Sequence, residues 1–146
     1  MELTGKNVFI TGSTRGIGAA VALAFAKAGA NIVLNGRKAI PEEKINEIKA
    51  QGVNCIGVSG DISDYEKAGL MVEEAEKQLG SIDILINNAG ITNDKLLMRM
   101  SAEDFKACLD INLTGTFNMT QHVLKKMMKK REGAIINLSS VSGLIG

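Results

Sequence analysis

The sequence predicts an α/β protein in which helices cover both faces of one parallel sheet, giving three layers. Short apolar runs alternate with amphipathic helical stretches along all 146 residues, which is typical of strand–helix–strand units. A turn with three glycines at residues 11–18 follows the first of these runs. No repeat, low-complexity segment or proline-rich linker interrupts the alternation. Together these observations favour a doubly wound parallel sheet.

The first half of the chain contains three predicted strands, at residues 7–11, 31–35 and 53–58. The helix after the first strand ends at Gly29 and carries an apolar stripe. The stripe consists of Ile17, Ala20, Val21, Ala24 and Ala28. A short helix opens at Pro41, because proline at the first helical position loses no N–H group that the helix needs.

The part of the chain after the third strand begins with a helix for which Ser63 and Glu66 have the spacing of a capping box. This helix ends at Gly80, and one apolar stripe runs along it. The stripe consists of Tyr65, Ala68, Val72, Ala75 and Leu79. Two further strands are predicted at residues 83–86 and 134–138, which brings the sheet to five strands.

The longest predicted helix, residues 101–130, lies between the last two strands, and Ser101 and Asp104 have capping-box spacing at its start. It carries two apolar stripes. The first contains Phe105, Cys108, Asn112, Thr116, Met119, Val123 and Met127, and the second contains Leu109, Leu113, Phe117, Leu124 and Met128. Because a helix on one sheet face needs a single stripe, we expect a homo-oligomer formed through this helix. The alternative is that a larger monomer buries both stripes.

Composition and charge argue against several classes of function. Seventeen Lys and Arg against sixteen Asp and Glu give a net charge of +1, so we expect no nucleic-acid and no membrane partner. No apolar run approaches the roughly 20 residues of a membrane span, and residues 1–10 lack the layout of a signal peptide, which predicts a cytoplasmic protein. Cys55 and Cys108 lack the spacing of a redox or zinc motif, so we expect reduced, buried thiols and no metal site.

The turn TGSTRGIG at residues 11–18 is a candidate phosphate-binding loop. Gly12 would allow the sharp turn, Gly16 would let the backbone approach a pyrophosphate, and Gly18 would let helix and strand pack closely. The free N–H groups and the positive dipole at the helix start would attract the anion. The spacing differs from the G-x-G-x-x-G fingerprint, so a purely structural turn is the alternative.

The cofactor preference depends on the end of the second predicted strand, Asn35-Gly36-Arg37. An NAD site is expected to place an acidic residue about 20 positions beyond the glycines, where it holds the ribose hydroxyls, and this sequence has none there. Arg15 and Arg37 can instead converge on a 2′-phosphate, which favours NADP(H) over NAD. The alternative is that both are ordinary surface arginines.

Further polar residues follow the carboxyl ends of predicted strands, where ligands of open α/β sheets bind. They include Asp61, Asn88, Ser139 and Ser140. Asn112 interrupts an otherwise apolar stripe, so we expect a buried amide whose hydrogen bonds are all made. A purely structural asparagine that bridges helix and strand is the alternative.

These motifs together resemble the short-chain dehydrogenase/reductase family. The likeness covers residues 3–146 and is carried by TGSTRGIG, Asp61-Ile62, NNAG, the mid-helix Asn112 and INLSSVSG. Within the family, the runs AGITNDKLLMRMSAEDF and MMKKREGAIINLSSVSGLIG are most similar to the 3-oxoacyl-[acyl-carrier-protein] reductases of type II fatty acid synthesis. The resemblance implies a Rossmann-type sheet of strand order 3-2-1-4-5 that lacks the last strands and helices of the full fold. Residues 1–146 would then be the NADP-binding, amino-terminal part of a single-domain reductase.

The resemblance also implies roles for individual residues. Those implied to bind the cofactor are Gly12, Ser13, Thr14, Arg15, Gly16, Ile17, Gly18, Arg37, Asp61, Ile62, Asn88, Ala89 and Gly90. Among them, Asp61 and Ile62 would contact the adenine. Asn112 would belong to the catalytic tetrad and hold a relay water, and Ser140 would donate a hydrogen bond to the substrate carbonyl.

The implied reaction transfers a hydride from NADPH to the 3-keto carbon of an acyl chain on acyl carrier protein. In the family a Tyr donates the proton and a Lys four residues later lowers its pKa; the single tyrosine here, Tyr65, lies in a different sequence context. We therefore expect the 146-residue chain alone to be inactive. The alternative is a non-catalytic nucleotide-binding or subunit-pairing module. Arg131, beside Lys130, resembles a docking residue for the acidic carrier protein, and a solvated helix end is the alternative.

Overall fold

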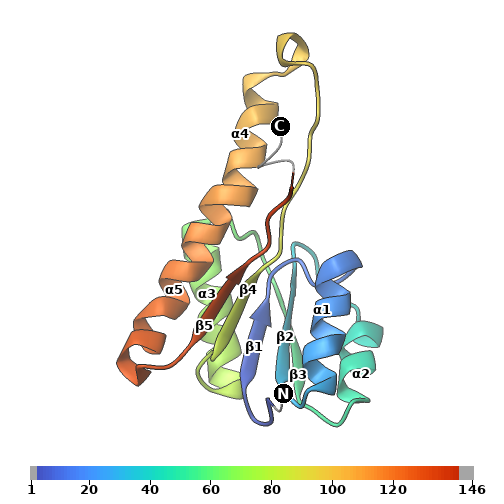
Figure 1. Cartoon of the computed structure of the whole chain (residues 1–146), viewed down its shortest axis with the longest axis vertical. Coiled ribbons are helices and arrows are strands. Elements are labelled where there is room, and N and C mark those ends of the chain that lie inside the picture. The colour runs from blue at the N-terminus through green and yellow to red at the C-terminus, as the bar shows by residue number, and fades with distance from the viewer. Residues whose placement is uncertain (1–2, 142–146) are drawn as a thin grey trace.

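Five parallel strands form one sheet in the computed structural model, which describes residues 3–141. The strands are β1 (Asn7–Ile10), β2 (Asn31–Gly36), β3 (Cys55–Ser59), β4 (Ile84–Asn87) and β5 (Ala134–Asn137). Their order is β3-β2-β1-β4-β5, so the chain builds outward from β1 first in one direction and then in the other (Figure 1). This order and the parallel pairing confirm the predicted doubly wound sheet.

Helices cover both faces of the sheet (Figure 1). On one face lie α1 (Gly16–Lys27) and α2 (Glu42–Lys49), and on the other lie α3 (Tyr65–Leu79) and α5 (Thr116–Lys130). The central strand alternates between two cores, since Val8 and Ile10 pack with α1 and α2 whereas Phe9 packs with α3 and α5. Within residues 3–141, no helix has both the length and the apolar character needed to cross a membrane.

The buried face of α1 differs from the predicted one. Ile17, Ala20 and Ala24 of the predicted stripe are exposed. The buried residues are Gly18, Ala22 and Ala26. Small side chains face the sheet because the start of the helix lies directly against the glycine loop. An alanine-rich helix has little polarity contrast between its faces, so the sequence pattern favoured the wrong one.

Two helix starts also differ in detail from the prediction. The N-cap of α3 is Asp64, whose carboxylate accepts a hydrogen bond from Lys67 N–H at 3.1 Å. Ser63 does not cap the helix, because its hydroxyl donates to Asp61 at 2.7 Å. Pro41 is the N-cap of α2, one position before the first helical residue. Asp and Ser are both good N-caps, and spacing alone does not rank two neighbours.

The long predicted helix is continuous but contains a π-helical turn. It runs through α4 (Ala102–Leu109), the π turn (Asp110–Gly115) and α5. The capping box at Ser101 and Asp104 is confirmed. The α4 part projects beyond the carboxyl edge of the sheet, which leaves Phe105 of the first stripe exposed (Figure 1). The second stripe is exposed throughout, at Leu109, Leu113, Phe117, Leu124 and Met128.

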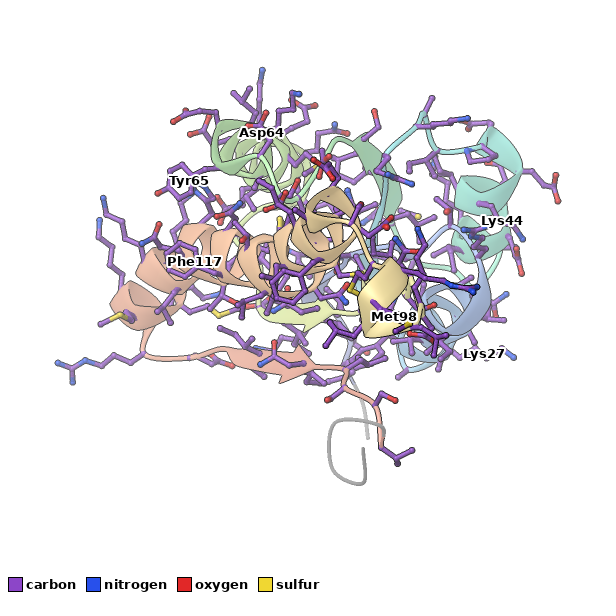
Figure 2. The ribbon with its side chains drawn as sticks, turned by 90° about the horizontal axis from the view of Figure 1, so that it is seen from above. Lys27, Lys44, Asp64, Tyr65, Met98 and Phe117 are labelled. Carbon is purple, nitrogen blue, oxygen red and sulfur yellow. The ribbon has the colours of Figure 1, made fainter. Side chains whose placement is uncertain are left out.

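Helices α3 and α5 pack side by side, and Tyr65 lies on the α3 side of this contact (Figure 2), where its ring meets the His122 ring of α5. The two ring centroids are 4.4 Å apart, and His122 Nε2 lies 2.9 Å from the carbonyl oxygen of Tyr65. A Cβ at Gly69 would lie only 2.8 Å from the imidazole, so this glycine makes room for the ring.

The two thiols differ in burial. Cys55 is buried, as predicted, whereas Cys108 is only half-buried because α4 projects beyond the sheet. Both are free, and burial raises the pKa of Cys55 to about 12, which keeps it protonated. In the part of the chain that the structure describes, no three His, Cys, Asp or Glu side chains are grouped so that they could hold a metal ion.

Candidate nucleotide-binding site

The candidate site lies at the carboxyl edge of the sheet, between β1 and β4. The glycine loop leaves β1 here, and the segment Asn88–Gly90 leaves β4 beside it. β2 flanks β1 on one side and β4 flanks it on the other, so the winding of the sheet reverses at this point (Figure 1). Ligands of open α/β sheets bind in the crevice at such a reversal.

Two asparagine side chains hold the backbone of Gly12. Asn35 Oδ1 accepts a hydrogen bond from Gly12 N–H at 3.2 Å, and Asn88 Nδ2 donates to the carbonyl oxygens of Gly12 and Thr11 at 3.0 and 2.9 Å. Gly12 has a φ of +62°, and a Cβ there would lie 3.0 Å from Ala89 Cα. The left-handed backbone and the close approach both require glycine.

Gly18 gives the close helix–strand contact expected of the third glycine. A Cβ at this position would lie 2.4 Å from the Gly12 carbonyl oxygen and 2.5 Å from Asn88 Nδ2, so any side chain would break their hydrogen bond. From the other direction, Thr11 Oγ1 accepts from the N–H groups of Asn88 and Ala89 at 3.0 and 2.9 Å. The glycine loop and the segment after β4 therefore form one hydrogen-bonded unit.

The start of α1 is open toward the site. Its N-cap, Arg15, makes no side-chain capping bond, and the N–H groups of the first turn have no intrahelical partner. Gly16 has a φ of +57°, and a Cβ there would meet no protein atom within 4 Å. Free N–H groups, the positive end of the helix dipole and open space fit a phosphate group.

The Ser13 side chain holds the loop from inside, and the Thr14 methyl group packs over Gly36. Ser13 is 1% exposed, and its hydroxyl donates to Ile10 O at 2.8 Å while it accepts from Asn35 N–H at 2.9 Å. The Thr14 methyl group would lie 3.1 Å from a Cβ at Gly36. Any contribution of Ser13 to ligand binding therefore comes from its main chain.

The two predicted cofactor arginines flank this junction. Arg15 follows Thr14, Arg37 follows Gly36, and both side chains are exposed. Neither makes an ion pair or a side-chain hydrogen bond to another residue within the described range 3–141. Two uncompensated guanidinium groups at the ends of adjoining segments suit a phosphate group, which accepts paired hydrogen bonds from arginine.

Asp61 and Ile62 follow β3, and only the Asp61 side chain is free to face a ligand. Asp61 Oδ1 accepts from both the N–H and the hydroxyl of Ser63, at 2.9 and 2.7 Å. Ile62 is 5% exposed, and a Cβ at Gly115 would lie 2.6 Å from its side chain. The Ile62 side chain therefore packs against the π turn, and only its main chain can reach a ligand.

Asn112 lies in the π turn and is exposed, so the expectation that it is buried is wrong. Its amide is nevertheless hydrogen-bonded, as predicted: Oδ1 accepts from Ile91 N–H at 2.8 Å, and Nδ2 donates to Ile91 O at 2.9 Å. A Cβ at Gly90 would lie 3.3 Å from Asn112 Oδ1. The structure therefore places Asn112 directly beside the segment that follows β4.

Ser140 is exposed and follows β5, the edge strand of the sheet. Asn87 ties the end of this strand in place, because its Nδ2 donates to Asn137 Oδ1 at 2.8 Å and to Thr120 Oγ1 at 3.1 Å. Leu138 N–H also donates to Asn87 O at 3.0 Å. Sequence reasoning missed the supporting roles of Asn87 and Asn35. Their signal is a polar side chain at the buried end of an apolar strand.

The predicted docking residues lie at the opposite, amino edge of the sheet. Lys130 Nζ contacts Asp83, just before β4, at 2.5 Å and Ser81 at 3.0 Å. Burial disfavours the Asp83 charge, but hydrogen bonds from Lys130 and Asn7 N–H outweigh it and lower the pKa of this carboxyl. Arg131 is exposed, with a φ of +54°. Within one chain, neither cation lies near the glycine loop.

A glycine loop at the winding reversal of a parallel sheet is the arrangement in which doubly wound folds bind nucleotides, so fold and site together place this chain in the doubly wound class. The chain belongs to the short chain dehydrogenase family, whose model matches residues 6–146. This finding confirms the family resemblance seen in the sequence.

Relatives and a solved structure agree with this membership. The chain is 43% identical to the 3-oxoacyl-[acyl-carrier-protein] reductase FabG of Staphylococcus aureus (strain Mu50) and 45% identical to that of Aquifex aeolicus (strain VF5), in each case over 100% of this chain and 60% of the relative. A crystal structure described as a short-chain alcohol dehydrogenase from Sinorhizobium meliloti 1021 matches with a TM-score of 0.95 and 31% identity, over 99% of this chain and 58% of that one. The chain thus spans about 60% of the length of the reductases it matches.

Proposed function

We propose that this chain forms the NADPH-binding part of a cytoplasmic 3-oxoacyl-[acyl-carrier-protein] reductase that reduces 3-oxoacyl chains to 3-hydroxyacyl chains in type II fatty acid synthesis. The observation that carries the proposal is the open start of α1 at Gly16, flanked by the exposed Arg15 and Arg37. The 43% identity to a reductase of that name supports the reaction class.

The site favours NADPH over NADH on electrostatic grounds. The main-chain N–H groups of the loop would hold the pyrophosphate, and the two arginines would share the 2′-phosphate. The end of β2 carries Asn35-Gly36-Arg37 and no carboxylate to hold free ribose hydroxyls.

The chain would supply part of the chemistry. NADPH supplies the hydride when bound. Ser140 would donate a hydrogen bond to the carbonyl oxygen that becomes negatively charged, and Asn112 would orient a water beside it. The sequence contains no Tyr-x-x-x-Lys motif to donate the proton. We therefore propose that these 146 residues bind NADPH but do not turn substrate over by themselves.

Titration calorimetry tests the cofactor assignment. The chain should bind NADPH about tenfold or more tightly than NADH, because a charge-assisted phosphate contact contributes about 1.5–3 kcal/mol. Arg37→Ala should remove most of this preference. Arg99 is exposed and lies in the segment between β4 and α4, so Arg99→Ala serves as the control, with no expected change. Equal binding of NADH and NADPH that Arg37→Ala leaves unchanged would contradict the proposal.

The exposed stripe on α4 and α5 supports a homo-oligomer, because five large apolar side chains lie in solvent on one helical face. Pairing through this stripe would also give Arg131 a role. It lies at the amino edge of its own sheet, so it would approach a site only if a second copy packed in antiparallel fashion. We propose that Arg131, together with the preceding Lys130, then contacts an acidic acyl carrier protein bound at the site of the second copy.

A non-catalytic module remains the second candidate, favoured by the lone tyrosine and the unpaired helical face. NADPH binding would not separate the two proposals. Mixing the chain with the remaining part of a related reductase does so, since only a reductase part should restore NADPH oxidation by a 3-oxoacyl substrate.

A further inference from the structure

We infer that Asn35 is the positioning residue that sets the preference of this site for a nucleotide with a 2′-phosphate. The inference rests on the proposed function and deepens it, because it names the group that aligns Arg15 with Arg37. Asn35 lies one residue before the end of β2 and is 2% exposed, so it acts through its neighbours and not by contact with the ligand.

Three hydrogen bonds join Asn35 to the glycine loop. Its carbonyl oxygen accepts from Ser13 N–H at 2.9 Å, and its own N–H donates to Ser13 Oγ at 2.9 Å. Its side-chain oxygen accepts from Gly12 N–H at 3.2 Å. Both the main chain and the side chain of one buried residue therefore fix where the loop lies relative to β2.

The side-chain nitrogen of Asn35, Nδ2, points toward β3 and α3. It donates to Val58 O on β3 at 3.4 Å and lies 3.2 Å from Met71 Sδ on α3. Just beyond, Gly60 N–H donates to Gly36 O at 3.0 Å, one residue before Asp61. Asn35 thus links the three segments that would contact the pyrophosphate, the 2′-phosphate and the adenine.

The same junction sets the separation of the two arginines. Arg15 lies two residues beyond Ser13, and Arg37 lies two residues beyond Asn35, with Thr14 packed over Gly36 between them. Both guanidinium groups can bind one 2′-phosphate only if the separation between them is fixed. A pyrophosphate needs only the N–H groups of the loop. Loosening the junction should therefore weaken NADPH binding more than NADH binding.

A purely structural Asn35 would give a different result. Without its side chain, the partly buried N–H of Gly12 would lose its acceptor, and the fold would be less stable. That loss would lower the affinity for NADPH and NADH by the same factor, because both need the loop. The ratio of the two dissociation constants therefore separates positioning from stability.

The test is calorimetric titration of the 146-residue chain and its variants with NADPH and with NADH. Asn35→Ala should bring a roughly tenfold preference for NADPH close to parity. Ser13→Ala is a smaller change at the same junction that keeps the Gly12–Asn35 bond, and it should lower the ratio less. It carries the test if Asn35→Ala does not fold.

Asn31→Ala is the matched control, because it removes an asparagine from the opposite end of the same strand, where Asn31 bonds to Asn7 and Asn54. It should lower the melting temperature and leave the ratio unchanged. The inference is overturned if Asn35→Ala and Ser13→Ala keep the wild-type ratio, or if Asn31→Ala shifts it equally. A wild-type chain with no preference for NADPH overturns the proposed function itself, before any variant is made.

Discussion

Asn88 joins the end of β4 to the loop after β1, because its Nδ2 donates to Gly12 O at 3.0 Å and to Thr11 O at 2.9 Å. Asn88→Ala would leave both carbonyl oxygens without this donor. We expect the free energy of unfolding in urea to fall by about 2 kcal/mol and NADPH affinity to fall with it. Asn93 lies between β4 and α4, where its side chain donates to Asp104, and Asn93→Ala should leave NADPH affinity unchanged. Full NADPH affinity in Asn88→Ala would show that this bond does not shape the site.

Arg131 adopts a left-handed backbone, with φ +54° and ψ +29°, directly after α5. This conformation costs a non-glycine residue roughly 1–2 kcal/mol, so Arg131→Gly should raise the free energy of unfolding by about 1 kcal/mol. The same variant should bind acyl carrier protein more weakly. Arg131→Ala should lose the binding without the added stability. If both variants bind the carrier protein as the wild type does, the docking role is wrong.

Asp83 should make the fold sensitive to acid. Its folded pKa is lowered, so its ion pair with Lys130 stabilises the fold above the unfolded pKa of about 3.9 and is lost as the pH falls through the folded value. Thermal unfolding followed by circular dichroism between about pH 6 and pH 2, the range in which carboxyl groups titrate, measures this loss of stability. Asp83→Asn should melt lower at neutral pH and lose less on acidification. Asp94→Asn, an exposed aspartate, is the control, and an identical acid profile for Asp83→Asn and the wild type would refute the assignment.

Phe117 is 55% exposed in the middle of the second stripe. Phe117→Glu should reduce self-association, because a charge at the centre of an apolar interface cannot be solvated there. Light scattering across a concentration series measures the effect. Leu70→Glu changes a side chain that is 64% exposed on α3 and should leave association unchanged. A wild-type chain that stays monomeric at every concentration would remove the basis for the oligomer.

Much of the fold could be predicted from the sequence, because apolar runs and helical periodicity report directly on burial. The five strands and the capping box at Ser101 follow from local patterns, and the structure confirms them. The buried face of α1 and the cap of α3 could not be ranked locally, since neighbouring residues offered nearly equal choices. The burial of Asn112 was wrongly predicted because helical periodicity does not show that α4 projects past the sheet.

The residues of the candidate site also fall into those that the sequence indicates and those that it does not. The glycine positions are local backbone requirements, so the sequence alone indicates Gly12 and Gly18. The residues that hold the loop are not local: Asn35 lies 23 positions from Gly12, and Asn88 lies 76 positions from it. Such contacts depend on where each side chain points once the strand ends meet, which no local pattern in the sequence shows.

The contact between Tyr65 and His122 can be monitored by the intrinsic fluorescence of the protein. The chain has one tyrosine and no tryptophan, so its intrinsic ultraviolet emission comes mainly from the Tyr65 ring of α3, which is 45% exposed and lies against His122 of α5. Separation of these two helices would remove the imidazole from the phenol and change that emission. Changes at the α3–α5 contact can thus be followed without a label.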